Sequence, residues 1–306
     1  MKISFVIAVY RNEGSIRKTY EKIRLIFSKL LASYKYEIIF IDDGSDDGSL
    51  KEILDVKKND SRIKAVSFTR NFGQMAAILA GLKESSGDAT INISADMQDP
   101  INMVPQMIKK WREGSEIVVC YRRGRSDSFT SKFLSHFAYR LLRLSYPKLP
   151  LGGFDYVLID RKALNEYNAI NVRNRSFQGD LLWTGYRTSF IPYLRLKRTI
   201  GKSQYNFFKK LKNFLDVFLD SSYIPIRIIS LIGIATSMIG VIYALSIIYA
   251  WFDKKTPFTG WAPIMIVLLF VGGFIMIMLG IIGEYIWRIY DELRKKPNYI
   301  IRDKYL

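Results

Sequence analysis

The stretch ISADMQDP, residues 93–100, combines side chains that bind a hard cation. Asp96 supplies a carboxylate, and Gln98 supplies a neutral amide oxygen two residues later. On an extended chain, residues two apart point to the same side, so both oxygens would face one ligand. Mg²⁺ and Mn²⁺ take such oxygen ligands together with phosphate oxygens and water. A polar loop without a metal is the alternative, and Asp99-Pro100 is also typical of a helix start with Asp99 as N-cap.

Four more polar clusters follow apolar, β-rich runs of the chain. The runs alternate with helical patterns at 15–32, 48–58, 73–86 and 101–113, and they span residues 3–9, 37–41, 64–68, 89–93 and 116–121. Strands that alternate with helices predict an α/β fold with a mostly parallel, doubly wound sheet. The clusters YRNE, DDGSDDG, TRNFG, SADMQDP and YRRGR would then all lie at the carboxyl ends of strands, where such sheets bind ligands.

The cluster DDGS at residues 42–45 has two interpretations that remain open. Asp, Gly and Ser all favour turns, so the segment is explained by a turn alone. A carboxylate at a strand end also accepts N–H bonds from a base or O–H bonds from a ribose. No GxGxxG follows the first run and no GxxxxGK[ST] occurs, which disfavours a dinucleotide oxidoreductase or a P-loop enzyme. The single histidine, His136, excludes a His-based zinc site, and the single cysteine, Cys120, excludes an internal disulfide.

The last third of the chain predicts a membrane hairpin. Spans at about 226–252 and 261–285 are long and apolar enough to cross a bilayer. The formal charge is +18, and basic residues gather at 122–143, 195–212 and 288–304, which favours an anionic membrane over nucleic acid as partner. The short loop between the spans has fewer basic residues than the tail, so the positive-inside rule puts the N-terminal domain and the C-terminus in the cytoplasm.

Two amphipathic segments precede the spans. Residues 128–146 and 203–223 repeat apolar side chains at intervals of three and four. Helices lying in the headgroup plane have this pattern, and helices packed on a globular domain have it too. Their position before the spans favours the membrane interface. The predicted organisation is therefore a catalytic domain at 1–200, an amphipathic helix at 201–224, two transmembrane helices within 225–287, and a basic tail at 288–306.

The order of these motifs resembles one family over nearly the whole chain. VYRNE, DDGSDDG, RNFGQMAAILAGL, SADMQDP, YRRGRSDS and RTIGKS, followed by the hairpin and GEYIWRIYDELRKKPNYIIRD, are similar to family 2 glycosyltransferases that load sugars onto polyprenyl phosphate. The nearest branch is the bacterial undecaprenyl-phosphate glycosyltransferases, which are related to dolichol-phosphate mannose synthases. The resemblance implies a GT-A fold, a nucleotide-sugar donor, a Mg²⁺ or Mn²⁺ ion and a polyprenyl phosphate acceptor.

The resemblance also implies roles for individual residues. Nucleotide and donor contacts fall on Tyr10, Asn12, Glu13, Asp42, Asp43, Arg70, Ser94, Ala95, Asp96 and Gln98, of which Asp96 and Gln98 match the metal ligands. Contacts to the lipid phosphate fall on Arg122, Arg125, Lys132, Ser135, Arg198 and Ser203. Asp96, Arg122 and Arg198 are the residues expected to carry catalysis.

Three departures from the family pattern bear on the sugar. Ser94 stands where many relatives have a first aspartate, Val157 where an arginine is frequent, and Gln178 where an arginine is common. The first leaves the metal site with one carboxylate fewer. The other two are expected near the sugar pocket, so they leave the identity of the sugar open.

The expected function is inverting transfer of one sugar, from UDP-glucose or a similar UDP-hexose, to undecaprenyl phosphate at the cytoplasmic face of the plasma membrane. A lipid phosphate is largely a dianion at neutral pH, so no base is needed to deprotonate it. A nucleotide- or lipid-binding scaffold without catalysis is the alternative from another class. A processive polysaccharide synthase needs a longer membrane channel and a QxxRW element, and the sequence has neither. Association of copies through the membrane helices also remains open.

Overall fold

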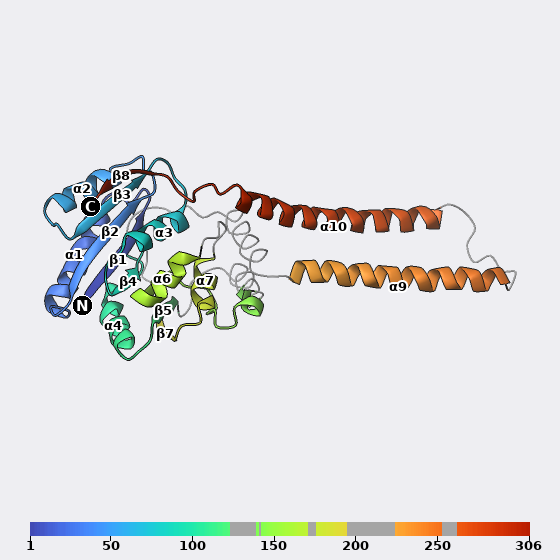
Figure 1. The fold of residues 1–306 in the computed structure, drawn as a ribbon, viewed down its shortest axis with the longest axis horizontal. Coiled ribbons are helices and arrows are strands. Elements are labelled where there is room, and N and C mark those ends of the chain that lie inside the picture. Colours follow the sequence, from blue (N-terminus) through green and yellow to red (C-terminus); the bar gives the residue numbers. More distant parts are fainter. Residues whose placement is uncertain (123–138, 141, 171–175, 195–223, 253–261) are drawn as a thin grey trace. The chain divides into compact units, whose positions relative to one another are not determined.

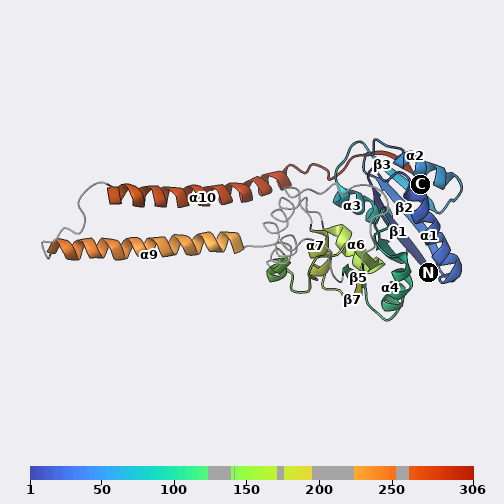
Figure 2. The ribbon, with the colours of Figure 1, turned by 180° about the vertical axis from the view of Figure 1, so that it is seen from behind.

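The structure, a computed structural model, falls into two compact units, Met1–Phe218 together with Pro297–Leu306, and Leu219–Lys296. It describes residues 1–122, 139–140, 142–170, 176–194, 224–252 and 262–306 (Figures 1 and 2).

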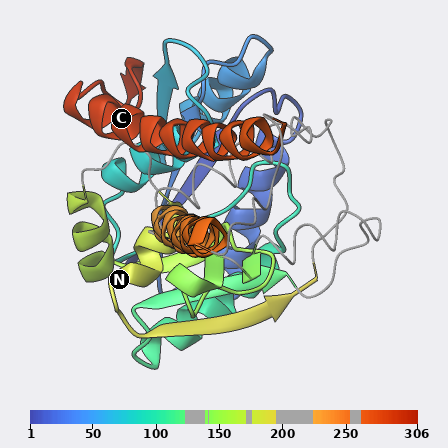
Figure 3. The same ribbon diagram turned by 90° about the vertical axis from the view of Figure 1, so that its right-hand side faces the viewer.

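The first unit is built on a mixed sheet with the strand order β7-β5-β6-β4-β1-β2-β3-β8. Figure 3 shows β7 (yellow) at one border of this sheet. The strands are β1 (Lys2–Val9), β2 (Lys35–Asp42), β3 (Ile63–Phe68), β4 (Ala89–Asn92), β5 (Ile117–Arg122), β6 (Tyr156–Asp160), β7 (Thr188–Tyr193) and β8 (Ile301–Tyr305). Neighbours pair in parallel except that β6 runs antiparallel to β4 and β5, and β8 runs antiparallel to β3. The predicted mostly parallel sheet is confirmed, and the structure adds β6, β7 and β8.

Helices cover both faces of the sheet. Helices α1 (Ile16–Lys29), α2 (Ser49–Lys58) and α4 (Val104–Arg112) contribute to one core, and α4 follows the 3₁₀ turn η1 (Ile101–Met103). Helices α3 (Gln74–Glu84), α6 (Arg161–Ala169) and α7 (Phe177–Trp183) contribute to a second core. Strand β2 divides its side chains between the two, with Ile38 and Phe40 in the first and Ile39 and Ile41 in the second. A strand buried on both faces explains the continuous apolar run EIIFI in the sequence.

The second unit contains two long apolar helices, α9 (Ile224–Phe252) and α10 (Ala262–Leu293). The segments Ile226–Ala250 and Phe270–Leu293 have mean hydropathies of 2.2 and 1.8, and almost none of their residues are buried. The core helix of a soluble protein would be mostly buried, so these exposed apolar surfaces suit a lipid environment. Both helices are long and apolar enough to cross a membrane, in agreement with the sequence.

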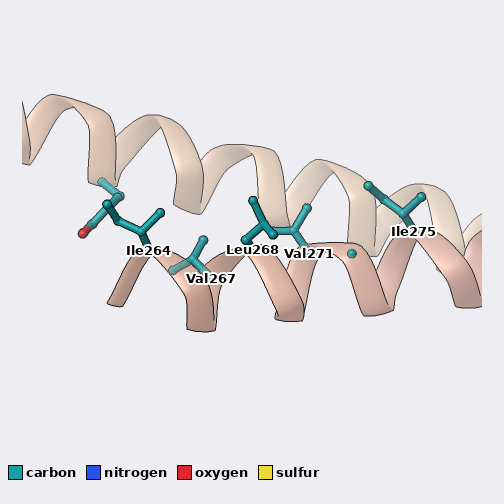
Figure 4. A pocket seen from close by; sticks show the side chains of 7 residues that line it. Ile264, Val267, Leu268, Val271 and Ile275 are labelled. Atoms are coloured by element: carbon teal, nitrogen blue, oxygen red, sulfur yellow. The ribbon is translucent and has the colours of Figure 1, made fainter. Parts of the chain in front are cut away.

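A groove between α9 and α10 is apolar throughout its lining, apart from the hydroxyl of Tyr243 (Figure 4). Ile264, Leu268 and Ile275 of α10 are among its lining side chains. It offers no charged group to a diphosphate or a cation. Asp42, Asp43, Asp96 and Arg122 all belong to the first unit.

The sequence predicts a basic tail over residues 288–306, and the structure differs. Residues 288–293 belong to α10, whereas β8 joins the sheet beside β3. The strand sequence IRDKY has three consecutive charged residues and no apolar run, so no local pattern identifies it as a strand. Of the two amphipathic segments, residues 139–140 and 142–145 are helical, and 203–223 lie outside the described residues, so their position at the membrane interface stays a prediction.

Candidate active site

The loops predicted to bind a nucleotide share one edge of the sheet. Strands β1, β2 and β3 are parallel, and their registers align Val9 with Asp42 and Asp42 with Ser67. The segments that follow these strands therefore begin side by side. This edge unites the clusters that start at Tyr10, Asp42 and Thr69.

Loop 10–14 and loop 42–48 are fastened to each other by side chains. The Arg11 guanidinium donates two hydrogen bonds of 2.6 Å to the Asp46 carboxylate. The Glu13 carboxylate accepts the Gly48 N–H at 3.2 Å, and a Cβ on Gly48 would lie 2.2 Å from the Glu13 Oε1 atom. Asn12 donates its N–H to Ser49 Oγ at 2.9 Å. Glu13, a predicted nucleotide contact, thus also holds the two loops together.

Asp42 and Asp43 lie almost fully buried at the centre of this edge. The Asp43 carboxylate accepts the N–H groups of Phe72 and Gly73 at 2.7 and 2.9 Å. The Asp42 carboxylate accepts the Ser45 N–H at 3.3 Å. Burial raises the pKa of Asp43 to about 6 and raises the pKa of Asp42 above its ordinary value. Among the described residues neither carboxylate forms an ion pair. Both can therefore accept N–H or O–H bonds from a ligand.

Gly44 is required where this turn meets the next loop. Its φ is +66°, and a Cβ there would lie 2.4 Å from the Arg70 carbonyl carbon. Only glycine allows both the left-handed backbone and this close approach. The chain bends at Gly44 directly after β2, and this glycine brings Asp42 and Asp43 against the loop that carries Arg70.

Residues 93–99, which we call the metal loop, contain a turn and are not an extended strand end. Strand β4 ends at Asn92, residues 95 and 96 form a turn, and Met97 has a φ of 58°. The argument from strand alternation for Asp96 and Gln98 is therefore wrong. The turn itself brings the two residues close, because the backbone N–H of Gln98 donates to Asp96 Oδ1 at 3.2 Å.

Asp99 is not the helix cap that its position before proline predicts. Its two carboxylate oxygens accept the Ser94 N–H at 3.0 Å and the Tyr193 hydroxyl at 2.8 Å. The turn η1 begins at Ile101, with Pro100 in the N-cap position and no side-chain cap. Long-range hydrogen bonds have replaced the local one, and they tie the metal loop to β7.

The donor set suits a hard cation only if a substrate completes it. The described residues contain no group of three or more His, Cys, Asp or Glu side chains placed to hold a metal. Asp96 and Gln98 offer one charged and one neutral oxygen, and Ser94 Oγ is buried without a hydrogen-bond partner among the described residues. Mg²⁺ commonly combines one or two carboxylates with substrate phosphate oxygens. The residues present fit that arrangement.

Arg122 ends β5 and is already paired in the structure. Its guanidinium lies 3.2 Å from Asp155 Oδ2, and its Nε donates to the Tyr193 hydroxyl at 3.5 Å. The same hydroxyl donates to Asp99, so the arginine is connected to the metal loop through one tyrosine. Burial, followed by the charge of Asp99, raises the pKa of Tyr193. Asp155 lies two residues before Val157 and received no role from the sequence, and Tyr193 had no sequence signal.

The remaining predicted residues divide into two groups. Val157 is fully buried in β6 and packs in the second core, whereas the Gln178 side chain lies against Gly153, where a Cβ would come within 2.6 Å of it. Gln178 thus adjoins the loop that carries Asp155. The lipid-phosphate candidates other than Arg122 lie outside the described residues: Arg125, Lys132, Ser135, Arg198 and Ser203.

Comparison with known proteins agrees with this architecture. Residues 4–168 match the family described as Glycosyl transferase family 2. The uncharacterized glycosyltransferase YkcC of Bacillus subtilis (strain 168) is 33% identical, with 100% of this chain and 94% of that protein covered. The bactoprenol glucosyl transferase of Shigella phage SfII is 34% identical, with 99% and 98% covered. These matches extend over both units of the chain.

A solved structure shows the same fold for the first unit. Glucosyl-3-phosphoglycerate synthase from Mycobacterium tuberculosis, in complex with Mn²⁺, UDP and phosphoglyceric acid, superposes with a TM-score of 0.50 at 19% identity. The match covers 71% of this chain and 76% of that one. The expected GT-A class is confirmed. With a family match over more than half its length and relatives that align from end to end, this chain belongs to glycosyltransferase family 2 and is a glycosyltransferase.

Proposed function

We propose that this glycosyltransferase transfers one sugar, with inversion, from a UDP-hexose such as UDP-glucose to polyprenyl phosphate at the cytoplasmic face of the plasma membrane. The observation that carries the proposal is the end-to-end similarity to a bactoprenol glucosyl transferase, which includes the two apolar helices. Loss of Asp96 or of the arginines proposed for phosphate would favour a nucleotide- or lipid-binding scaffold without catalysis, and Asp96, Arg122 and Arg198 are all present.

The donor nucleotide would bind along the loops after β1, β2 and β3. Asp42 and Asp43 are buried acceptors, and a uracil or ribose presents the N–H and O–H donors that such acceptors need. The bonds between loop 10–14 and loop 42–48 fix this edge before any ligand arrives. Preformed loops lower the ordering cost of binding.

The diphosphate would lie against the metal loop. A bound Mg²⁺ or Mn²⁺ would neutralise the charge that grows on the leaving diphosphate, and Asp96 and Gln98 are the residues that would hold it. Asp99 fixes the backbone of this loop through Ser94 and Tyr193. The loop would therefore keep Asp96 in place while the glycosidic bond to the diphosphate breaks.

The lipid phosphate would arrive near Arg122. As a dianion it needs no general base, and the protein has to hold two anions against their repulsion. The Arg122 guanidinium can exchange its 3.2 Å contact with the half-exposed Asp155 for a charge-assisted phosphate contact. Arg198, outside the described residues, is proposed for the same task.

The membrane topology proposed is a hairpin. Strands β1–β7 precede α9, and β8 follows α10, yet all belong to one sheet. Two crossings return the chain to its starting side, which this shared sheet requires. The positive-inside rule favours the cytoplasm for that side. A cysteine introduced at Thr256 should react with an impermeant maleimide added to intact cells, and one introduced at Ser45 should not; labelling of Ser45→Cys from outside would refute the orientation.

The decisive experiment is transfer by purified protein in lipid vesicles. We expect radiolabelled sugar to move from UDP-glucose to undecaprenyl phosphate as a single lipid-linked residue. Omitting the lipid phosphate, or replacing it with undecaprenol, serves as the control. A panel of other UDP-, GDP- and dTDP-sugars identifies the donor. Binding of nucleotide sugars without turnover of any of them would favour the scaffold, and products with several sugars would favour a processive synthase.

A further inference from the structure

The C-terminal strand lies directly beside the loops assigned to the donor. Strand β8 pairs with β3 along the sheet, and this pairing continues into the loop, because the Thr69 N–H donates to the Ile300 carbonyl at 3.1 Å. Residue 69 is the last before Arg70, a predicted nucleotide contact. The end of the chain thus reaches the base of the donor site, although about 230 residues separate the two in sequence.

The pairing has an irregularity at Arg302. Ser67 pairs with Asp303 and Phe68 with Ile301, so Arg302 is passed over as in a β-bulge. Bulges redirect a side chain and are frequent beside active sites. The Arg302 guanidinium donates to the Thr69 carbonyl at 3.1 Å. Burial is the main influence on the pKa of Asp42 and raises it, while the positive charge of Arg302 acts in the opposite direction. The bulge therefore directs the Arg302 guanidinium toward the end of β2 that carries Asp42 and Asp43.

A series of aromatic contacts connects Tyr299, just before β8, with the loop at residues 69–73. Tyr299 stacks on Phe68 with ring centroids 4.9 Å apart and planes at 11°. Phe68 meets the ring of Phe72 edge-on at 5.8 Å, and the Arg70 guanidinium lies 4.1 Å from the Phe72 centroid. Offset aromatic contacts and cation–π contacts fix the relative positions of the groups involved. Tyr299 is therefore connected to Arg70 through two phenylalanines.

The loop at residues 69–73 contacts the segment that carries Asp42 and Asp43. Phe72 and Gly73 donate their N–H groups to Asp43, and the backbone at Arg70 and Asn71 packs on Gly44. A shift of residues 69–73 would move these N–H groups away from Asp43. The position of the loop therefore decides the geometry of Asp43.

We propose that Tyr299 and Arg302 are positioning residues of the donor site, which hold residues 69–73 so that Asp43 and Arg70 meet the nucleotide. This inference rests on the proposed function in taking a nucleoside diphosphate sugar as the ligand. It assigns a role to residues after the membrane hairpin, in a segment whose basic composition suggested a tail. The donor site is completed only when the chain has returned from the hairpin and β8 has paired.

A purely structural edge strand is the competing explanation, and Lys304 supplies the matched control. The Lys304 ammonium pairs with Glu84 at the end of α3, so Lys304→Ala removes a β8 contact that does not involve residues 69–73. Tyr299→Phe keeps the stacked ring and should behave as the wild type. Arg302→Ala and Tyr299→Ala remove the contacts that define the proposal.

The first measurement uses ligand-free full-length protein in detergent or nanodiscs. Hydrogen exchange followed by mass spectrometry should be faster in a peptide covering 69–73 for Arg302→Ala and Tyr299→Ala, and unchanged for Lys304→Ala and Tyr299→Phe. Unchanged exchange in the first two, or equal acceleration in all variants, overturns the inference. This arm does not depend on the identity of the donor, so it separates the inference from the proposed function.

The second measurement uses steady-state transfer. Loss of one hydrogen bond or stacked ring should raise the KM for the nucleotide sugar between about two- and tenfold. The KM for the lipid phosphate and the kcat should stay within about twofold of the wild type. Equal rises in both KM values, or a fall in kcat alone, would contradict a role confined to the donor.

Discussion

At the amino end of β2, the Glu37 carboxylate lies between the ammonium groups of Lys2 and Lys64, at 2.7 and 3.1 Å. Ser4 and Ser86 donate further hydrogen bonds to it. At the carboxyl end of the same strand, Asp42 and Asp43 are equally buried, but their hydrogen bonds within the described residues come from Ser45 and from the backbone N–H groups of Phe72 and Gly73, and no ammonium or guanidinium group pairs with them. One strand thus carries buried carboxylates in two different electrostatic environments.

The pKa values follow this difference. Burial alone would raise the pKa of Glu37, but hydrogen bonds from Lys2, Ser4 and Ser86 lower it to about 2. Burial raises the pKa of Asp43 to about 6, and two backbone hydrogen bonds do not offset it. A carboxylate that is neutralised within the chain stabilises the fold, whereas one that lacks a cation is available to a ligand. A shifted pKa by itself therefore does not indicate a functional residue. The direction of the pKa shift and the groups that contact the carboxylate do.

The largest effect should follow from removing the charge of the metal loop. Asp96→Asn retains an oxygen for the Gln98 N–H, so the loop and the fold should persist. Transfer should fall by on the order of a hundredfold or more, because the loss affects charge stabilisation at the leaving group. Transfer assays and a melting curve measure the two properties separately.

Gln98→Ala should lower transfer less than Asp96→Asn, since water can replace a neutral oxygen, and EDTA should abolish wild-type activity. Full activity in EDTA would contradict the metal site.

A change at the amino end of β2 should alter the stability of the folded protein and leave sugar transfer unchanged. Glu37→Gln removes the charge between Lys2 and Lys64 and should destabilise the folded state by about 3 kcal/mol at neutral pH, from the lowering of its pKa from 4.5 to about 2. Thermal unfolding of the full-length protein measures this. Asp55→Asn, at an exposed ion pair with Lys58, should change little.

The pH dependence of Glu37 has a definite sign. Because its folded pKa lies below the ordinary value, its contribution is complete above pH about 4.5 and is lost as the pH falls toward 2. Glu37→Gln should lack this component. A change in KM for either substrate, at temperatures where the variant is folded, would contradict a purely structural role for the amino end.

Arg122 should give an intermediate effect. Arg122→Ala should lower turnover at least about tenfold through the loss of a charge-assisted phosphate contact. Asp155 is partly exposed and can be solvated without its partner, so the fold should survive. Arg294→Ala, at an exposed arginine beside Tyr290, should cost almost nothing in vesicle assays. Equal small losses at both positions would indicate that the arginines only attract the membrane, and Arg198→Ala applies the same test outside the described residues.

The sequence predicts the parts of this site that depend on local pattern. Strands β1 to β5 were recognisable from short apolar runs, and the polar residues after them fall at one edge because parallel strands end together. Asp42, Asp43 and Asp96 could be singled out on that basis alone. The family resemblance added their roles.

The remaining contacts join segments that are distant along the chain. Tyr193 meets Asp99 across 94 positions, and Arg302 meets Thr69 across 233, so no local pattern announces either. Local rules also failed where tertiary contacts outweighed them. Asp99 became a long-range acceptor instead of a cap, and Met97 took a left-handed conformation that an extended strand end excludes.

The smallest effect expected concerns the protonation of Asp43. Its raised pKa means that the folded protein binds a proton between pH about 4 and 6, so ionising Asp43 costs stability as the pH rises through this range. The sign is opposite to that of Glu37 on the same strand. If the carboxylate accepts a bond from the base, only its ionised form binds, and nucleoside affinity should weaken as the pH falls.

Uridine is the suitable probe, because UDP and the lipid phosphate titrate near the same pH. With a pKa of about 6 for Asp43, the ionised fraction and hence the affinity for uridine should fall about fourfold between pH 7 and 5.5. Competition against the donor, or saturation-transfer NMR, measures this. Asp43→Asn should bind more weakly at pH 7 and lose the pH dependence, whereas Asp46→Asn, at the exposed pair with Arg11, should retain it. Affinity that is independent of pH in the wild type would show that the ligand does not need the ionised carboxylate, and the contrast between the two ends of β2 would then concern stability alone.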